Sequence, residues 1–274
     1  MRGSAWRWAV AVVITLASAV WQRVSGPTYP ARGTVTLGGE TIALRLDRSH
    51  VVGSDQEVEV RAGNAAVTGE LVWRRFPTSE PWQIAPMPRR GEVLSAALPR
   101  QPAAGKLEYQ VRLSRGGEQA VFPSRPAVTR FRGEVPAAVL IPHILAMFAA
   151  MLLATRAGTE ALGRKGRPRR FVLGTLGFLL LGGFVLGPLV QRFAFGEWWA
   201  GVPFGWDLTD NKTLIALLAW LAALWAGHGG RQGRAAALAA ALVTLAVFAV
   251  PHSAWGSQLD WSKLPPPAAT APPR

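Results

Sequence analysis

The C-terminal half of the chain carries apolar runs of roughly membrane-span length, separated by short polar segments. These runs occupy residues 136–154, 171–190, about 213–227 and about 235–251. A helix that crosses a bilayer needs about 20 predominantly apolar residues, and its backbone polar groups must be satisfied within the segment because lipid offers no hydrogen bonds. We therefore expect an integral membrane protein in which residues 136–262 form an α-helical bundle of four spans.

Basic residues gather in two of the segments between these runs. Six arginines or lysines lie within residues 156–170, and Arg231 and Arg234 lie between the last two runs. Positively charged loops stay in the cytoplasm. We therefore place the region before the first run, the loop at 191–212 and the segment after the last run on the exported side of a bacterial-type inner membrane. This topology accounts for the formal net charge of +14, and nucleic acid is not expected as a partner.

The first 22 residues combine basic and apolar character. Arg2 and Arg7 precede an apolar run of roughly fourteen residues, which is short for a span, and an Ala-Ser-Ala segment lies at 17–19. This pattern is typical both of a cleaved signal peptide and of an N-terminal anchor helix. The two alternatives remain open, and both export the segment that follows.

Residues 29–132 form a region of short alternating runs. TIALRLD at 41–47 and LEYQVRLS at 107–114 are examples, and Gly, Pro, Asn and Ser separate them. Regularly spaced runs of this kind predict an antiparallel, Ig-like β-sandwich. We expect Trp73 and Tyr109 in its core. Since the region shows no nucleophile–base pattern, it is predicted to bind a periplasmic protein or another membrane subunit.

The chain contains no cysteine, which excludes disulfides, thiolate metal sites and haem attachment through Cys-x-x-Cys-His. Any cofactor must therefore be held by histidine, carboxylate or backbone groups. The motifs of serine hydrolases, zinc proteases and P-loop proteins are not present in the sequence either, so enzymatic activity is not expected. The proline-rich segment 263–274 is predicted to be extended and disordered.

Two of the four histidines fall in the exported half of the predicted bundle. His143 lies seven residues into the first run, about 10 Å below the exported surface. His252 follows the last run, about 27 Å from the cytoplasmic face. Ionisable residues at such depths are costly and usually functional. Two neutral imidazoles on facing helices can ligate the iron of a b-type haem, but a single buried histidine can equally hydrogen-bond to a neighbouring helix.

The loop at 191–212 is rich in aromatic and charged residues. Its candidate cofactor-binding residues are Arg192, Trp198, Trp199, Trp206, Asp207 and Lys212. The aromatic faces would cover an apolar macrocycle, and the two cations would pair with its propionates. The same tryptophans also fit an interfacial aromatic belt. Asp207 and Asp210 also fit a helix cap and a first-turn acid that complements the helix dipole.

The order of these features resembles the haem-handling proteins of cytochrome c biogenesis. That family carries a W-G-x-x-W-x-W-D loop between two spans, and histidines on the flanking spans hold haem. The matching segments are IPHILAMFAAMLLATRAG with His143, TLGFLLLGGFVLGPLVQRFAFGEWW, FGWDLTDNKTLIALLAWL with Trp206 and Asp207, and VPHSAWGS with His252. The resemblance covers residues 137–262 and not the β-region, and Phe204 stands where the family has a tryptophan. It implies that His143 and His252 are axial haem ligands.

The leading hypothesis is therefore a membrane protein that binds haem b near the exported face, in haem handling, cytochrome c maturation or electron transfer. The alternative is a non-enzymatic interaction subunit, anchored in membrane lipid, whose β-region binds a periplasmic partner. A third hypothesis is an ion or quinone site that uses His143, Asp207, Asp210 and Lys212 for proton transfer.

Overall fold

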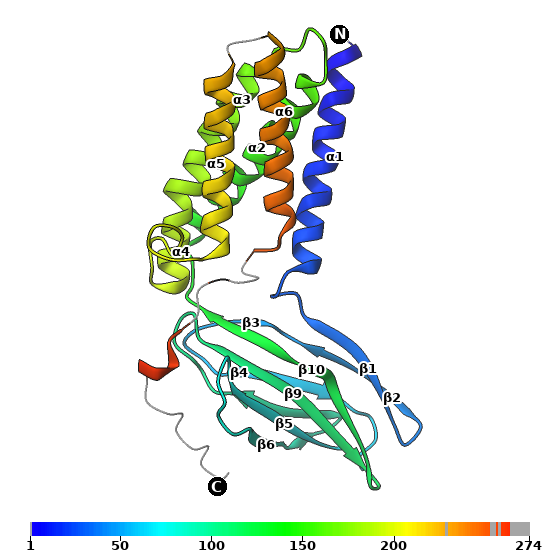
Figure 1. Ribbon diagram of the computed structural model, residues 1–274. Coiled ribbons are helices and arrows are strands. Elements are labelled where there is room, and N and C mark those ends of the chain that lie inside the picture. Colours follow the sequence, from blue (N-terminus) through cyan, green and yellow to red (C-terminus); the bar gives the residue numbers. More distant parts are fainter. Residues whose placement is uncertain (1, 228–229, 253–255, 257–258, 264–274) are drawn as a thin grey trace. The chain divides into compact units, whose positions relative to one another are not determined.

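The computed structural model describes residues 2–227, 230–252, 256 and 259–263, and Figure 1 shows the path of the chain. The chain folds as two compact units. The helical unit consists of Met1–Pro27 and Val135–Ser257, and the β unit consists of Thr28–Glu134 and Gln258–Arg274. The predicted proline-rich tail lies outside the described residues from position 264 on.

The helical unit contains every long helix that the structure describes. Its elements are α1 (Arg2–Ser25), α2 (Ala137–Ala161), α3 (Arg169–Leu179), the π-helix η1 (Leu180–Leu186), α4 (Gly187–Phe195), α5 (Leu208–Ala226) and α6 (Gly230–Ala249). Because α3, η1 and α4 follow one another directly, residues 169–195 form one continuous helical rod.

Four stretches of the described residues are long and apolar enough to cross a membrane: Ala5–Ser25, Ala137–Ala161, Arg169–Phe195 and Arg231–Ala249. The predicted run at 213–227 also forms a helix, but α5 is not one of the four because Asp210, Asn211 and Lys212 occupy its first turns.

The N-terminal helix α1 is longer than the sequence predicts and belongs to the helical unit. Its span-length stretch has 21 residues. Arg7 Nη1 lies 2.8 Å from Glu160 Oε2 of α2. At the other end of α1, Trp21 Nε1 donates to the Ala249 carbonyl at 2.8 Å, and the Gln22 amide donates to the Phe248 carbonyl. Side chains of α1 therefore satisfy carbonyl groups that the end of α6 leaves open.

Small side chains fill the interior of the helical unit. The buried alanines are Ala150, Ala154, Ala157 and Ala161 of α2, Ala216 and Ala223 of α5, and Ala237, Ala240 and Ala241 of α6. Small residues let helices approach closely when lipid, rather than water, surrounds them. Trp220 is also buried there, but many other large apolar side chains face outward, as the exposed fractions of Leu145 (65%) and Trp225 (87%) show.

The β unit contains three sheets, whose neighbouring strands run antiparallel except for the pair β3–β10. The two-stranded sheet pairs β1 (Ala31–Leu37) with β2 (Glu40–Leu46). The five-stranded sheet has the order β3 (Ser49–Val51), β10 (Glu118–Arg132), β9 (Lys106–Arg115), β5 (Thr68–Arg75) and β6 (Gln83–Met87). The three-stranded sheet has the order β4 (Gln56–Arg61), β8 (Val93–Leu98) and β7 (Arg89–Arg90).

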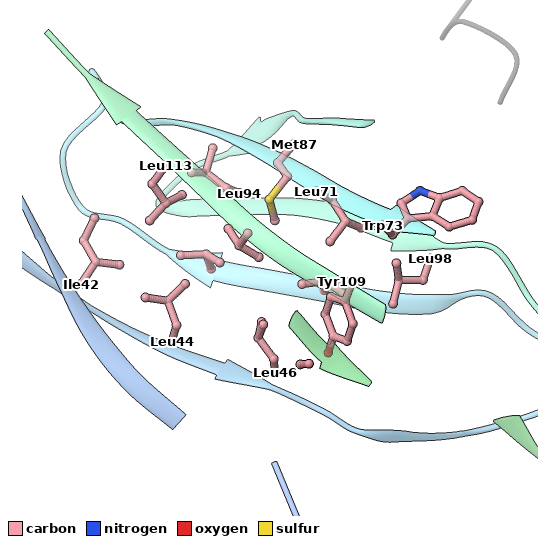
Figure 2. Close-up of a cluster of buried hydrophobic side chains, with 14 of the residues drawn as sticks. Ile42, Leu44, Leu46, Leu71, Trp73, Met87, Leu94, Leu98, Tyr109 and Leu113 are labelled. Carbon is pink, nitrogen blue, oxygen red and sulfur yellow. The ribbon is translucent and has the colours of Figure 1, made fainter. Parts of the chain in front are cut away.

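Apolar side chains from all three sheets meet in one core, part of which Figure 2 shows. Trp73 and Tyr109 are 1% and 0% exposed, which confirms the prediction that they lie in the core. The Tyr109 hydroxyl donates to the Asp47 carbonyl at 2.6 Å. A buried hydroxyl therefore keeps a hydrogen-bond partner, as the low polarity of the core demands.

The alternating runs at 41–47 and 107–114 form β2 and β9 as predicted, but the longest strand, β10, is not apparent in the sequence. Pro123 and Pro126 interrupt its alternation, and its pairing with β9 shifts register between Phe122 and Ala127. An irregularity of this kind bends a strand and breaks the period-two pattern on which the prediction depends.

Candidate functional site

His143 makes a hydrogen bond between two helices of the helical unit. Its Nδ1 lies 2.9 Å from the Gly182 carbonyl oxygen of η1. Because a carbonyl oxygen only accepts, Nδ1 carries the proton and donates. A neutral imidazole protonated at Nδ1 leaves the lone pair of Nε2 free. Metal-ligating histidines usually have this arrangement, although the same bond also suits a histidine that only joins two helices.

The π-helix η1 explains how the Gly182 carbonyl is presented to His143. The carbonyl also accepts the Gly187 N–H, five residues on, which is the spacing of a π-helix. A Cβ atom at Gly182 would lie 2.8 Å from Met147 Sδ, and one at Gly183 would lie 2.5 Å from Thr213 Cγ2. Glycine at these positions lets η1 pass close to α2 and α5, because a side chain there would have to displace Met147 or Thr213. Single π-helical turns occur frequently at functional sites.

His252 follows α6, with its ring edge-on to Phe248 at 6.5 Å between centroids. It lies within electrostatic range of Lys212, His143 and Asp207. Desolvation by the surrounding atoms, the Lys212 ammonium and His143 together lower the pKa of the His252 imidazole to about 3, while Asp207 opposes them. His252 is nevertheless an exposed residue by its accessible surface. The two predicted histidines therefore lie at the same end of the helical unit, which we call the loop end, and His252 is neutral there.

A small groove lies beside His252. Residues of α1, α2 and α6 line it, among them Thr15, Gln22, Met151 and Phe248, and its volume is about 100 Å³. Sites for drug-sized ligands usually measure about 300–1,000 Å³. The groove therefore accepts a small group, whereas a macrocycle at His252 requires neighbouring segments to move.

Two aspartates hold the loop at 191–212 against the start of α5. Asp207 Oδ1 caps the helix by accepting from the N–H groups of Thr209 at 2.8 Å and Asp210 at 3.4 Å, which confirms the interpretation of Asp207 as a cap. Asp210 Oδ2 accepts from the Ala200 N–H at 2.7 Å. Burial raises the pKa of the Asp210 carboxyl to about 6, although bonds from the loop backbone oppose the shift.

The tryptophans of the loop divide into one packed and two exposed side chains. Trp199 stacks on Phe184 of η1 at 5.4 Å between centroids, and its Nε1 donates to the Val202 carbonyl at 3.1 Å. Trp198 and Trp206 are 56% and 87% exposed. The exposed pair has aromatic faces available to an apolar ligand or to the membrane interface.

The two cations predicted to meet propionates lie in different surroundings. The Arg192 guanidinium is exposed, donates to the Gly196 carbonyl and lies 6.0 Å from the Trp198 ring. Lys212 is 2% exposed, and its Nζ donates to the Val250 carbonyl at 2.7 Å. Lys212 therefore ties α5 to the end of α6, whereas Arg192 remains accessible at the surface.

The chemistry available at the loop end follows from these contacts. Among the residues that the structure describes, no group of three or more His, Asp or Glu side chains could hold a metal ion. Asp207, Asp210 and Lys212 hold the loop and the helix ends together, so their contacts do not favour an ion or quinone site. What remains is a pair of imidazoles at the loop end of the helical unit.

Sequence reasoning identified the two histidines but missed the Gly182 carbonyl, which sets the His143 tautomer. The adjacent glycines Gly182 and Gly183 were the available signal, since glycine permits close helix contacts. The chain matches no protein-family model and no curated protein sequence. A functional interpretation therefore rests on the geometry of the loop end.

Proposed function

We propose that this protein is inserted in a membrane and binds a b-type haem at the loop end, with His143 and His252 as axial ligands. The observation that carries the proposal is the bond from His143 Nδ1 to the Gly182 carbonyl, because it leaves Nε2 free to ligate iron. His252 lies close enough to His143 for the two side chains to interact electrostatically, and it is the second neutral imidazole at this end. Haem bound by two histidines would supply one-electron transfer.

Four apolar helices and the basic residues of the α2–α3 connection support the proposed membrane insertion. By the positive-inside rule the loop end faces the exported side of a bacterial-type inner membrane. The bonds from α1 to α2 and α6 favour an anchor helix over a cleaved signal peptide, because cleavage would leave Glu160 and the carbonyls at the end of α6 without these partners.

The other predicted site residues fit the haem unequally. The exposed rings of Trp198 and Trp206 suit contact with the macrocycle, and Arg192 suits a propionate. Lys212 fits poorly, because it is buried and bonded to Val250. Since the groove at His252 holds only about 100 Å³ and is lined by residues of α1, α2 and α6, we expect these helices to move apart when haem binds. By resemblance to cytochrome c biogenesis proteins, the bound haem is handled during cytochrome c maturation or used in electron transfer.

The test is a visible absorption spectrum of the full chain, purified in mild detergent from haem-replete cells, before and after reduction with dithionite. We expect sharp reduced b-type bands in the wild type. His143→Ala and His252→Ala should both lose them, whereas His50→Ala, in the β unit, should retain them as the matched control. A colourless wild type, or unchanged bands in His143→Ala, would contradict the proposal.

A second candidate function is that of an anchored interaction subunit with an Ig-like domain. The observation that favours it is the edge position of β6 in the five-stranded sheet, where Ile84 is 51% exposed. An open sheet edge can pair with a strand of a partner. If the protein has this function, deleting residues 30–132 would abolish its complex with the partner, as measured by the size of the complex in mild detergent. His143→Ala would leave the complex intact.

A further inference from the structure

Two adjoining cavities lie at the opposite end of the helical unit, which we call the arginine end and which comprises residues 162–170 and 231–234. Figure 1 shows the α2–α3 connection and the start of α6 at this same end. The first cavity, of about 580 Å³, is lined by the side chains of Lys165, Arg167, Arg169 and Arg234. The second, of about 610 Å³, shares the first three of these cations and adds Arg170, Leu173 and Glu160.

The cations around the cavities are not neutralised by the acidic side chain beside them. In the described part of the chain, the one carboxylate that lines either cavity is Glu160. Its Oε2 is already bonded to Arg156 at 2.7 Å and Arg7 at 2.8 Å, and its Oε1 accepts from the Arg167 backbone N–H. The cavities therefore keep an excess of positive charge that favours an anion.

The start of α3 adds backbone donors to the same region. The helix begins at Arg169, and its N-cap Pro168 provides no side-chain hydrogen bond. The first N–H groups of a helix carry a partial positive charge. Since the Phe171 and Val172 N–H groups donate to the Pro168 carbonyl at 2.8 and 3.0 Å, the backbone donors that supplement the side-chain cations are those of Arg169 and Arg170.

Exposed apolar side chains continue from the cavities along the helices. Leu173, which lines the second cavity, is 47% exposed, and Leu162 at the end of α2 is 65% exposed. Trp225, in the last turn of α5 at the same end, is 87% exposed. Tryptophan in such a position is typical of the membrane interface. A molecule bound here would meet positive charge at one end and an apolar surface beyond it.

We propose that the arginine end binds the phosphate group of an anionic phospholipid, with Arg167 and Arg169 as its principal ligands. Arginine binds phosphate oxygens through paired N–H donors, and basic pockets between helix ends are a recognised form of anionic head-group site. The positive-inside rule requires only that positive charge be present on this side. It does not require two adjoining cavities that are lined by the same three cations. The proposal depends on the membrane insertion proposed above and is independent of the haem site.

The test uses the delipidated full chain in non-ionic detergent. Native mass spectrometry would measure binding of phosphatidylglycerol, zwitterionic phosphatidylcholine and inorganic phosphate. We expect phosphatidylglycerol to bind much more tightly than phosphatidylcholine. The double variant Arg167→Gln/Arg169→Gln should weaken phosphatidylglycerol roughly 25-fold, since each arginine near an anionic group contributes a factor of about five.

The matched control is Arg164→Gln/Arg231→Gln, which removes the same charge from the same end at two exposed residues that do not line either cavity. It should change phosphatidylglycerol affinity by less than about threefold. Equal weakening by both double variants would overturn the proposal, because it would indicate diffuse surface charge. Displacement of the lipid by inorganic phosphate at comparable concentration would contradict the claim that the bound phosphate group belongs to a phospholipid. Alkaline extraction of the membranes tests insertion separately.

Discussion

The interiors of the β unit and the helical unit differ in their mixture of side chains. The β-unit core consists of large apolar residues such as Leu71, Trp73 and Tyr109, none more than 1% exposed. Alanine is the commonest residue in the interior of the helical unit, which also buries Trp220 (0% exposed) and the cations Arg156 and Lys212 (1% and 2%). Its outer surface carries further large apolar side chains.

This difference is the one expected when a chain has one unit in water and the other in lipid, as proposed above for the helical unit. In water, removing apolar surface drives folding, and the largest side chains are buried. In lipid that gain disappears, so helices associate through close packing and polar contacts. Arg156 illustrates the second case, because its guanidinium lies 2.7 Å from Glu160 and 4.3 Å from the Phe171 ring.

A matched pair of tryptophan substitutions tests the comparison most strongly. Trp73→Ala empties part of the β-unit core and should lower the free energy of unfolding of that unit by about 3–5 kcal/mol. Trp225→Ala removes the same side chain from an exposed position and should change stability by less than about 0.5 kcal/mol. Hydrogen exchange of the full chain in detergent would measure both. A large loss for Trp225→Ala would show that α5 is packed against protein, which would contradict an outward-facing surface.

The packing of helices by small residues is tested by a pair of glycines with opposite expectations. A Cβ at Gly158 would lie 2.8 Å from Ala241 Cβ, whereas a Cβ at Gly177 meets no atom within 4 Å. Gly158→Ala should separate α2 from α6 and destabilise the helical unit by about 1–3 kcal/mol. Gly177→Ala should stabilise it by up to about 1 kcal/mol through helix propensity.

Thermal unfolding of the wild type and the two glycine variants, each purified in mild detergent, would measure the change in stability. If Gly158→Ala raised the unfolding temperature as Gly177→Ala does, the close contact between α2 and α6 would not be a determinant of the fold, and the small-residue interior would need another explanation.

The two units also differ in how far the sequence predicts them. Period-two alternation locates β2 and β9, and the burial of Trp73 and Tyr109 follows from it. Apolar run length locates the start of α2 and the end of α6 to within two residues but misses the last seven residues of α2 and the first five of α6. It also does not predict which face of a helix turns inward. The sequence analysis underestimated the length of α1 because the predicted apolar run starts after Arg7, whereas the candidate span runs from Ala5 to Ser25 and includes that arginine.

The candidate site shows the same limit. The sequence singled out His143 and His252 because polar groups are rare in apolar runs. It could not show that Lys212 turns inward to the Val250 carbonyl, since that choice depends on which helix end lies within reach of a long side chain. The π-helix escaped as well, because the glycines that permit η1 also fit an ordinary helix of small residues.

The smallest expected effect concerns the buried phenol that completes the β-unit core. Burial raises the pKa of Tyr109 above its usual value near 10, the Asp47 carboxylate adds to the shift, and Arg48 and Gln56 oppose it. Because the folded pKa exceeds the unfolded one, the contribution of the protonated phenol is complete below about pH 10 and is lost as the pH rises above it.

Tyr109→Phe should cost about 1 kcal/mol at pH 8, because it leaves the Asp47 carbonyl without its donor. Above pH 10 that difference should shrink by about 1.4 kcal/mol per pH unit. Urea unfolding of the wild type and Tyr109→Phe at pH 8, 10 and 11 would measure it. A constant difference across this range would mean that the phenol ionises as readily in the folded chain as in the unfolded one, which would contradict the burial of Tyr109 in a dry core.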